Sequence, residues 1–430
     1  MNCLSAFRKT PSCWALLVVV ASLAACGVPA SESADRANNR EYSLHYTLSP
    51  DPATSTVRVE MRLRQPHDLV RESSFPVSDR VSDVGGDGDL RVHYIRVLWQ
   101  PPEDGGALEW RVLVRKERGN NAFDALLNTK WGIFRAEDVI PRARTRTLKG
   151  AESRTTLTFD LPAGWSAISE YSALEQPIVI NRTERRFDEP TGWIAMGKLG
   201  IRRETIAGTR VAIAAPQAHA VRRMDMLALL NWTLPELNEV LPDALPRLTI
   251  ISAGEPMWRG GLSAPASLFL HADRPLISEN ATSSLLHEVM HTALGLRPRD
   301  GNDWIVEGLA EYYSIQLLRR GHAISASRAK KAFARQAEWG AQSAFLCGEE
   351  STAATTALAV TIFRKLDREL LEKSDGKVDL DSLLPNLVNS DIDLNSLIVA
   401  VEEMIGVTPD ALHSDNLPGC SSMAPGSQEL

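Results

Sequence analysis

The stretch His287-Glu288-Val289-Met290-His291 is an H-E-x-x-H motif, and it decides the fold and chemistry expected of this chain. On a helix, residues four apart lie on one face, so its two histidines can bind the same metal ion. A second stretch of helical character, Trp304–Tyr313, carries Glu307. A carboxylate from a second helix is the third protein ligand that a catalytic zinc site needs. We therefore expect His287, His291 and Glu307 to bind Zn²⁺ and to leave its fourth position open.

Glu288 is the expected catalytic base. Zinc lowers the pKa of a bound water to roughly 7, and a neighbouring carboxylate can accept the released proton. Glu288 would then pass the proton to the leaving amine of a cleaved peptide bond. Glu311 follows Glu307 by one helical turn, so it can accept an N–H from a zinc-binding histidine. The alternatives are a helix with two exposed histidines and, for Glu311, a surface carboxylate.

These residues resemble the gluzincin metallopeptidases, and most of all the glycyl aminopeptidase family, which shares its core with the leucine aminopeptidase-like enzymes. Residues 287–291 match the zinc helix of that family, and residues 304–313 match its W-x-x-E-G-x-x-x-Y-Y helix. Residues 259–262 are similar to its glycine turn, and residues 267–271 to its substrate-holding edge strand. The resemblance implies a zinc metallopeptidase whose substrate pairs with this strand. The implied substrate-binding residues are Gly260, Gly261, Leu268 and Leu270.

Two positions depart from the family pattern. Ser263 stands where the family has a glutamate that holds the free amino group of the substrate. Ala353-Ala354-Thr355-Thr356 stands where the family has a Tyr-x-x-Gly whose tyrosine stabilises the oxyanion. A second oxyanion donor must then come from elsewhere. The candidates are Tyr312, Tyr313, His322 and His413, and His271 is a further histidine that could line the cleft.

The expected function is zinc-dependent peptide-bond hydrolysis, as an endopeptidase or an aminopeptidase. The two departures leave an alternative open, in which a catalytically weakened peptidase-like lipoprotein serves as a binding or scaffold module. Hydrolysis of a non-peptide amide is a third interpretation. With 430 residues and a formal net charge of −7, the chain lacks the basic balance typical of nucleic-acid binding. The expected partners are a peptide or protein substrate and, through a lipid anchor, a membrane.

The N-terminus predicts export and lipidation. The apolar run Trp14–Leu23 follows two positive residues and is too short for a comfortable membrane span. It ends in Leu23-Ala24-Ala25-Cys26, which resembles the lipobox of bacterial lipoproteins. Acylation of Cys26 would anchor the protein, and Gly27 favours the outer membrane facing the periplasm. The alternative is an ordinary signal peptide with a chance cysteine.

Two of the five cysteines remain after the signal peptide and the lipid site, namely Cys347 and Cys420. In an oxidising periplasm they can form a disulfide that ties the C-terminal tail to the helical domain. Two free buried thiols are the alternative.

The hydrophobic pattern predicts an α+β fold, with an N-terminal β-sandwich-like domain followed by a mainly helical domain. The resemblance implies that this second domain is a thermolysin-like zinc peptidase domain with a small edge sheet. Apolar and polar residues alternate over 42–48, 57–63, 108–114 and 157–161, which predicts strands. A shift of this alternation within 90–99 predicts a bulge or bend. Helices are expected at 224–240, 326–339, 353–373, 379–389 and 394–405. The expected segments are a signal peptide 1–25, a polar tether 26–40, a β domain 41–215, a helical zinc domain 216–412 and a tail 413–430.

Overall fold

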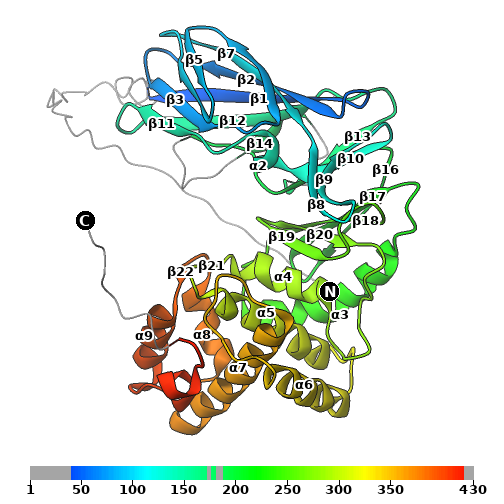
Figure 1. The fold of residues 1–430 in the computed structure, drawn as a ribbon, viewed down its shortest axis with the longest axis vertical. Coiled ribbons are helices and arrows are strands. Elements are labelled where there is room, and N and C mark those ends of the chain that lie inside the picture. The colour runs from blue at the N-terminus through cyan, green and yellow to red at the C-terminus, as the bar shows by residue number, and fades with distance from the viewer. Residues whose placement is uncertain (1–39, 172–175, 181–186, 421–430) are drawn as a thin grey trace, which may run out of the picture. The chain divides into compact units, whose positions relative to one another are not determined.

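Sheets fill the N-terminal half of the chain and helices fill most of the C-terminal half (Figure 1). The computed structural model describes residues 40–171, 176–180 and 187–420. The predicted signal peptide, the lipid site Cys26, nearly all of the tether and the end of the tail lie outside these residues. Within the described ranges, no helix combines the length and the apolar character needed to cross a bilayer. The mixed α+β class is confirmed.

Two sheets of the N-terminal half share one core. The first has the order β14-β12-β1-β2-β7-β4, and the second has the order β11-β3-β6-β5. Buried side chains from both sheets belong to a single hydrophobic cluster. The strands of the first sheet are β14 (Ile178–Ile180), β12 (Glu152–Phe159), β1 (Glu41–Asp51), β2 (Thr56–Arg64), β7 (Gly105–Leu113) and β4 (Val81–Gly86). Those of the second are β11 (Arg144–Thr147), β3 (Val70–Pro76), β6 (Arg96–Gln100) and β5 (Asp89–His93).

Alternation of apolar and polar residues places these strands because one face of each is buried. In β1, Tyr42, Leu44 and Tyr46 are at most 1% exposed, and the residues between them are partly or fully exposed. The bulge or bend predicted within 90–99 is a tight turn and not a bulge. There the chain turns at Tyr94 and Ile95 and pairs β5 with β6 as a hairpin, which shifts the phase of the pattern.

A third sheet connects this half to the rest of the chain. Its order is β13-β15-β10-β9-β8. Its strands are β13 (Ser166–Ile168), β15 (Trp193–Gly197), β10 (Trp131–Arg135), β9 (Ala122–Leu127) and β8 (Arg115–Gly119), with the short helix α2 (Ala136–Val139) following β10. Buried residues of this sheet, among them Trp193 and Ile133, share a cluster with Phe269 and Ile251 of the next sheet.

The sheet next to the zinc motif has the order β16-β17-β18-β20-β19. Its strands are β16 (Leu199–Ile206), β17 (Thr209–Pro216), β18 (Arg247–Ala253), β20 (Ser267–His271) and β19 (Gly261–Ala264). The expected domain boundaries stay predictions, but this sheet crosses residue 215, since β16 and most of β17 precede it.

The expected edge strand is misplaced, because β20 lies inside this sheet. Leu268 pairs with β18 on one side and with Ser263 of β19 on the other, and Leu270 is paired in the same way. Both leucine side chains are fully buried. Their main chain therefore cannot receive a substrate strand, and β19 is the edge beside the zinc motif.

The zinc motif lies on α4, which packs beneath β19 and β20 (Figure 1). The hydroxyl of Ser283 caps α4 by accepting the N–H of Leu286, and Gly295 ends the helix in a left-handed conformation. The start of α4 is joined to α5, because the Ser283 N–H donates to Ser314 Oγ and that hydroxyl donates back to the Ser283 carbonyl. The helices are α3 (Arg223–Val240), α4 (Ser284–Leu294), α5 (Asp303–Arg320), α6 (Ala326–Gly340), α7 (Ala353–Lys373), α8 (Leu380–Leu387) and α9 (Leu394–Ile405).

The described part of the C-terminal tail, residues 413–420, is joined to the helical part of the chain. A disulfide joins Cys347, which lies between α6 and α7, to Cys420, with 5.1 Å between their Cα atoms. The carbonyl of Pro418 accepts the N–H of Leu346 beside it. Short strands β21 (Arg297–Pro298) and β22 (Asp391–Ile392) pair near the end of α4, and two short 3₁₀ turns follow α9.

Candidate metal centre

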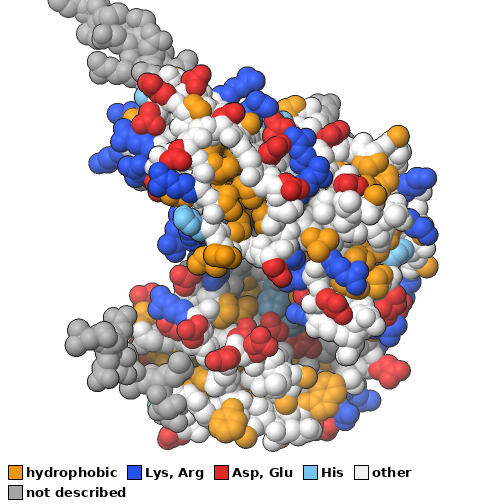
Figure 2. Space-filling view, turned by 45° about the horizontal axis from the view of Figure 1, so that its top comes forward, with side chains coloured by type: hydrophobic (Ala, Val, Ile, Leu, Met, Phe, Trp, Pro, Cys, Tyr) orange, Lys and Arg blue, Asp and Glu red, His pale blue; other side chains and the backbone are white. Residues whose placement is uncertain are grey.

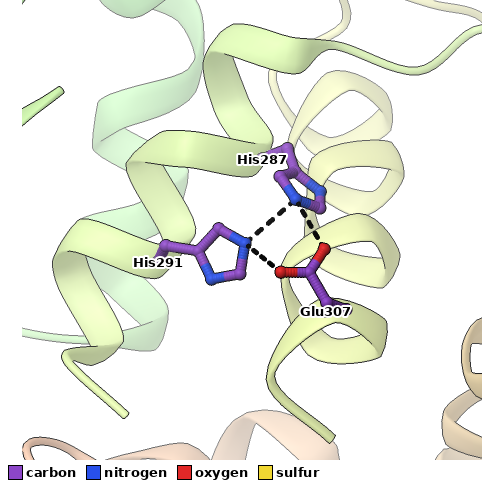
Figure 3. Close-up of side chains that lie close together, drawn as sticks. All are labelled: His287, His291 and Glu307. Carbon is purple, nitrogen blue, oxygen red and sulfur yellow. Dashed lines mark hydrogen bonds and ion pairs between the residues drawn. The ribbon is translucent and has the colours of Figure 1, made fainter. Parts of the chain in front are cut away.

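Two adjacent helices bring three candidate ligands to one point (Figure 3). His287 and His291 lie one turn apart on α4, and their Nε2 atoms are 2.9 Å apart. Glu307 reaches them from α5, with its carboxylate oxygens 3.3 Å from His287 Nε2 and 3.2 Å from His291 Nε2. The structure therefore brings together the three residues expected to bind the metal.

This donor set fits a zinc ion. Two imidazole nitrogens and one carboxylate are the ligands of many catalytic zinc sites. With bonds of about 2.0–2.2 Å, neighbouring ligand atoms around tetrahedral zinc lie roughly 3.3–3.6 Å apart. The observed separations of 2.9, 3.2 and 3.3 Å are close to these values. Small outward shifts of the side chains would accommodate the ion.

Charge at the site also favours a cation. Burial disfavours a charged His287, but its hydrogen bonds with Glu307 and Glu311 outweigh burial and raise its pKa well above the usual range. Burial acts against a charged Glu307 as well, yet the two histidines lower the pKa of this carboxyl far below its ordinary value. The carboxylates thus stabilise positive charge between them, and a bound metal ion would use the same stabilisation.

Glu311 orients one of the histidines. Its Oε2 lies 3.1 Å from His287 Nδ1, so it can accept the N–H there and leave Nε2 facing the metal position. The other oxygen of Glu311 accepts a hydrogen bond of 3.1 Å from Gln336 Nε2 on α6. Gln336 was not found from the sequence, since nothing in its pattern connects α6 to the site.

The carboxylate of Glu288 lies between α4 and the edge strand β19, and the residue is 8% exposed. A main-chain hydrogen bond from Ser263 holds it, although burial dominates and raises its pKa. The Glu288 side chain fits here because residue 261 is a glycine. A Cβ at Gly261 would lie 2.6 Å from Glu288 Cγ and 2.7 Å from its Oε1. The neighbouring residue 260 must be a glycine for a different reason. A Cβ added at Gly260 would lie 1.9 Å from Trp258 Cζ3 and overlap the ring.

A cavity of about 760 Å³ opens at the site. The space-filling view shows this face hollowed, with histidine in its depth and acidic side chains on its lower wall (Figure 2). The sequence missed several of its lining residues, because most come from other segments of the chain and no local pattern marks the rest as parts of a site. These are Arg118, Arg135, Trp258, Arg274, Asp303, Glu350 and Ser351.

The four expected oxyanion donors do not line this cavity. The hydroxyl of Tyr312 donates to Asp367 at 2.8 Å, and that of Tyr313 donates to Asp381 at 2.8 Å, so both point into the helical core. His322 and His413 are exposed at other positions. His271 is buried, and its Nδ1 accepts the Asp273 N–H, so it is also not a cleft residue.

No protein-family model matches this chain, and no curated protein matches its sequence. Its fold does match solved structures. The aminopeptidase N family protein from Idiomarina loihiensis has a TM-score of 0.66 at 14% identity, over 87% of this chain and 76% of that one. An M1 zinc metallopeptidase from Deinococcus radiodurans has a TM-score of 0.54 at 14% identity, over 87% and 92%. Yeast LTA4 hydrolase has a TM-score of 0.53 at 14% identity, over 90% and 68%.

The structural neighbours of this chain are therefore gluzincin zinc metallopeptidases of the M1 family. At this level of identity the likeness shows the fold alone. The narrower resemblance to the glycyl aminopeptidase family stays a prediction.

We expect the full chain to bind one zinc ion, and His291→Ala or Glu307→Ala to lose it. Glu311→Gln should weaken zinc binding about 10- to 100-fold, because His287 would lose the partner that fixes its tautomer. Elemental analysis after dialysis, together with a chelator competition titration, measures both effects. The control is His322→Ala, which removes an exposed histidine. Unchanged zinc content in His291→Ala would contradict the assignment.

Proposed function

We propose that this chain hydrolyses peptide bonds with bound zinc and with Glu288 as the base that activates water. The observation that carries the proposal is the position of Glu288, buried against β19 and adjacent to the three convergent ligands. Zinc, when bound, supplies Lewis-acid polarisation and a lowered pKa for water. A scaffold has no need of a buried, oriented carboxylate beside its metal position.

Each residue of the site has its own role in the proposed reaction. His287, His291 and Glu307 hold the metal, and Glu311 sets the tautomer of His287. Glu288 takes the proton from water and delivers it to the leaving amine, while the Ser263 N–H holds its carboxylate in place. This assignment matches the resemblance to gluzincins for the metal ligands and the base, and it departs from the resemblance at Ser263 and at the oxyanion donor.

The substrate would lie along β19, which is the edge of its sheet beside α4. It would pair at Gly261, because both main-chain groups of Ser263 are already bonded. A second cavity of about 690 Å³ shares Ser263, His291 and Leu296 with the first. A peptide could therefore extend to both sides of the metal position. Main-chain pairing at an edge tolerates many side chains, so it alone selects no sequence.

We also propose a domain architecture for this chain and a location in the cell. The two N-terminal sheets with a common core would form a β-sandwich-like domain, and the helices with the mixed sheet a thermolysin-like zinc peptidase domain. Cys26 would carry a lipid that holds the protein at the outer membrane, facing the periplasm. The bond between Cys347 and Cys420 supports an oxidising compartment.

One observation favours a second candidate function. Within the described residues, none of the four expected oxyanion donors reaches the cavity. Losing such a donor typically costs about a hundredfold or more in rate. A catalytically weakened module that binds peptides in the same cleft is therefore the alternative.

Glu288→Gln should keep the zinc ion and lose hydrolysis about 100- to 10,000-fold, because the amide cannot accept the proton. Peptides with free and with blocked N-termini should be assayed against both forms, with zinc content measured in parallel. The control is Glu338→Gln, on the exposed face of α6. Equal inertness of wild type and mutant, with zinc bound, would support the binding module. Preference for blocked peptides would indicate an endopeptidase.

Gly261→Ala should lower kcat/KM about a hundredfold while zinc stays bound. The added methyl displaces the Glu288 carboxylate, and a shift of about 1 Å can cost this much. Gly85→Ala is a matched control, since a Cβ there meets no atom within 4 Å. An active Gly261→Ala enzyme would show that the base does not work from the observed position.

Cys26→Ser should release the protein from membranes, because it removes the thiol that would be acylated. Fractionation of cells into membrane and periplasmic extracts measures this. A mutant that remains with the membranes would refute the lipid anchor.

A further inference from the structure

One wall of the catalytic cavity is basic. It carries Arg118 from β8, Arg135 at the end of β10, and Arg274 after β20. The first two belong to the sheet formed by β8, β9, β10, β13 and β15, whereas the metal ligands come from α4 and α5. The cavity therefore combines a metal-binding wall with a cationic one.

Two of these guanidinium groups are held in place by aromatic faces and main chain. The Arg118 guanidinium lies 3.9 Å from the centre of the Trp258 ring, with Asp124 at 3.5 Å. Arg135 lies 5.2 Å from the centre of the Trp193 ring, and its Nη2 donates to the Ser263 carbonyl at 2.7 Å. Such groups lose little further freedom when they bind a ligand.

Most acidic side chains in the cavity already have partners. Glu307 bonds to both histidines, and Glu311 bonds to His287 and Gln336. Asp303 accepts the N–H of Ser351 at 2.8 Å. The exposed Glu350 is the exception. In the described part of the chain, by contrast, the Arg274 guanidinium has no hydrogen-bond or ion-pair partner.

A small recess lies next to the basic wall. Its volume is about 160 Å³, and Arg118, Arg135 and Leu262 line both it and the main cavity. Lys116 adds a third positive charge against the two carboxylates of Asp124 and Asp138. Since water occupies about 30 Å³ per molecule in the liquid, the recess has room for a carboxylate and the atoms that carry it.

We propose that this wall is a carboxylate-binding subsite, which selects peptides bearing a negative charge close to the bond at the metal. The planar guanidinium groups of Arg118 and Arg135 match the fork of a carboxylate, and Arg274 adds long-range attraction. The carboxylate can be an acidic side chain or a free C-terminus. The proposal rests on the proposed peptide hydrolysis, but binding tests it without turnover.

The experiment measures binding to the zinc-loaded full-length Glu288→Gln protein by calorimetry. Three peptides with blocked N-termini are compared. One has a single glutamate and an amidated C-terminus, one has neutral side chains and a free C-terminus, and the third is neutral throughout. We expect at least one charged peptide to bind about tenfold or more tightly than the neutral one, and to weaken as salt rises. The tighter of the two identifies the source of the carboxylate.

Arg118→Gln and Arg274→Gln should each remove much of this preference, and Arg135→Lys should retain part of it. The matched control is Arg259→Gln, whose exposed side chain pairs with Glu255 and Asp273 instead of lining the cavity. Equal binding of all three peptides, or equal losses in Arg259→Gln and Arg118→Gln, overturns the proposal. If wild type hydrolyses neutral and charged peptides equally, the subsite fails and the hydrolase stands. If charged peptides bind through the arginines but none is cleaved, the subsite stands and the proposed hydrolase fails.

Discussion

The carboxylate of Glu288 lies directly against the main chain of β19, and much of the site depends on this contact. It requires a residue without a side chain at Gly261 and a free N–H at Ser263. The carbonyl of the same serine accepts a hydrogen bond from the guanidinium of Arg135, which lies at the end of β10. Ser263 therefore links the catalytic helix to the N-terminal sheets through its two main-chain groups. The Glu288 carboxylate is held in place as a result, since α4 is largely buried and packs against the partly buried β19.

The metal ligands depend on a second constraint, which is the spacing of α4 and α5. Reciprocal hydrogen bonds between Ser283 and Ser314 join the start of α4 to the middle of α5. On the far side of α5, Gly308 lets α7 approach closely, because a Cβ there would lie 2.5 Å from Ala359 Cβ. Glu307 is thus held against the histidines by packing on both faces of its helix. This packing would limit the ordering that the three side chains need when a metal ion binds.

Short-range periodicity is enough to predict helices and the residues that share one helical face. The i, i+4 spacing of His287 and His291 requires one such face, and the bounds of α7 and α9 are set by their caps and apolar stripes. Sheet order is not encoded in a local pattern, because a buried apolar strand is similar to an edge strand that faces a cleft. For this reason the sequence alone misassigns β20 as the edge. Arg118 and Arg135 could not be found, since only the tertiary fold brings them to residues 261–291.

The charges of the cavity bear on which end of a peptide it can recognise. Ser263 offers no side-chain charge to an ammonium group, and its main-chain groups are already bonded. Glu307 and Glu311 bond to the histidines, Glu288 accepts the Ser263 N–H, and Asp303 accepts the Ser351 N–H. Among the acidic lining residues of the described chain, this leaves Glu350 without a hydrogen-bond partner. It is exposed, and solvent screens a charge in that position. Arg118 and Arg274 are exposed as well, but Arg135 is partly buried and lies beside the strand that would hold substrate, so solvent screens its charge least. The proposed carboxylate subsite would therefore give the cleft a preference for a carboxylate over a free amine, even though the fold is shared with structures described as aminopeptidases.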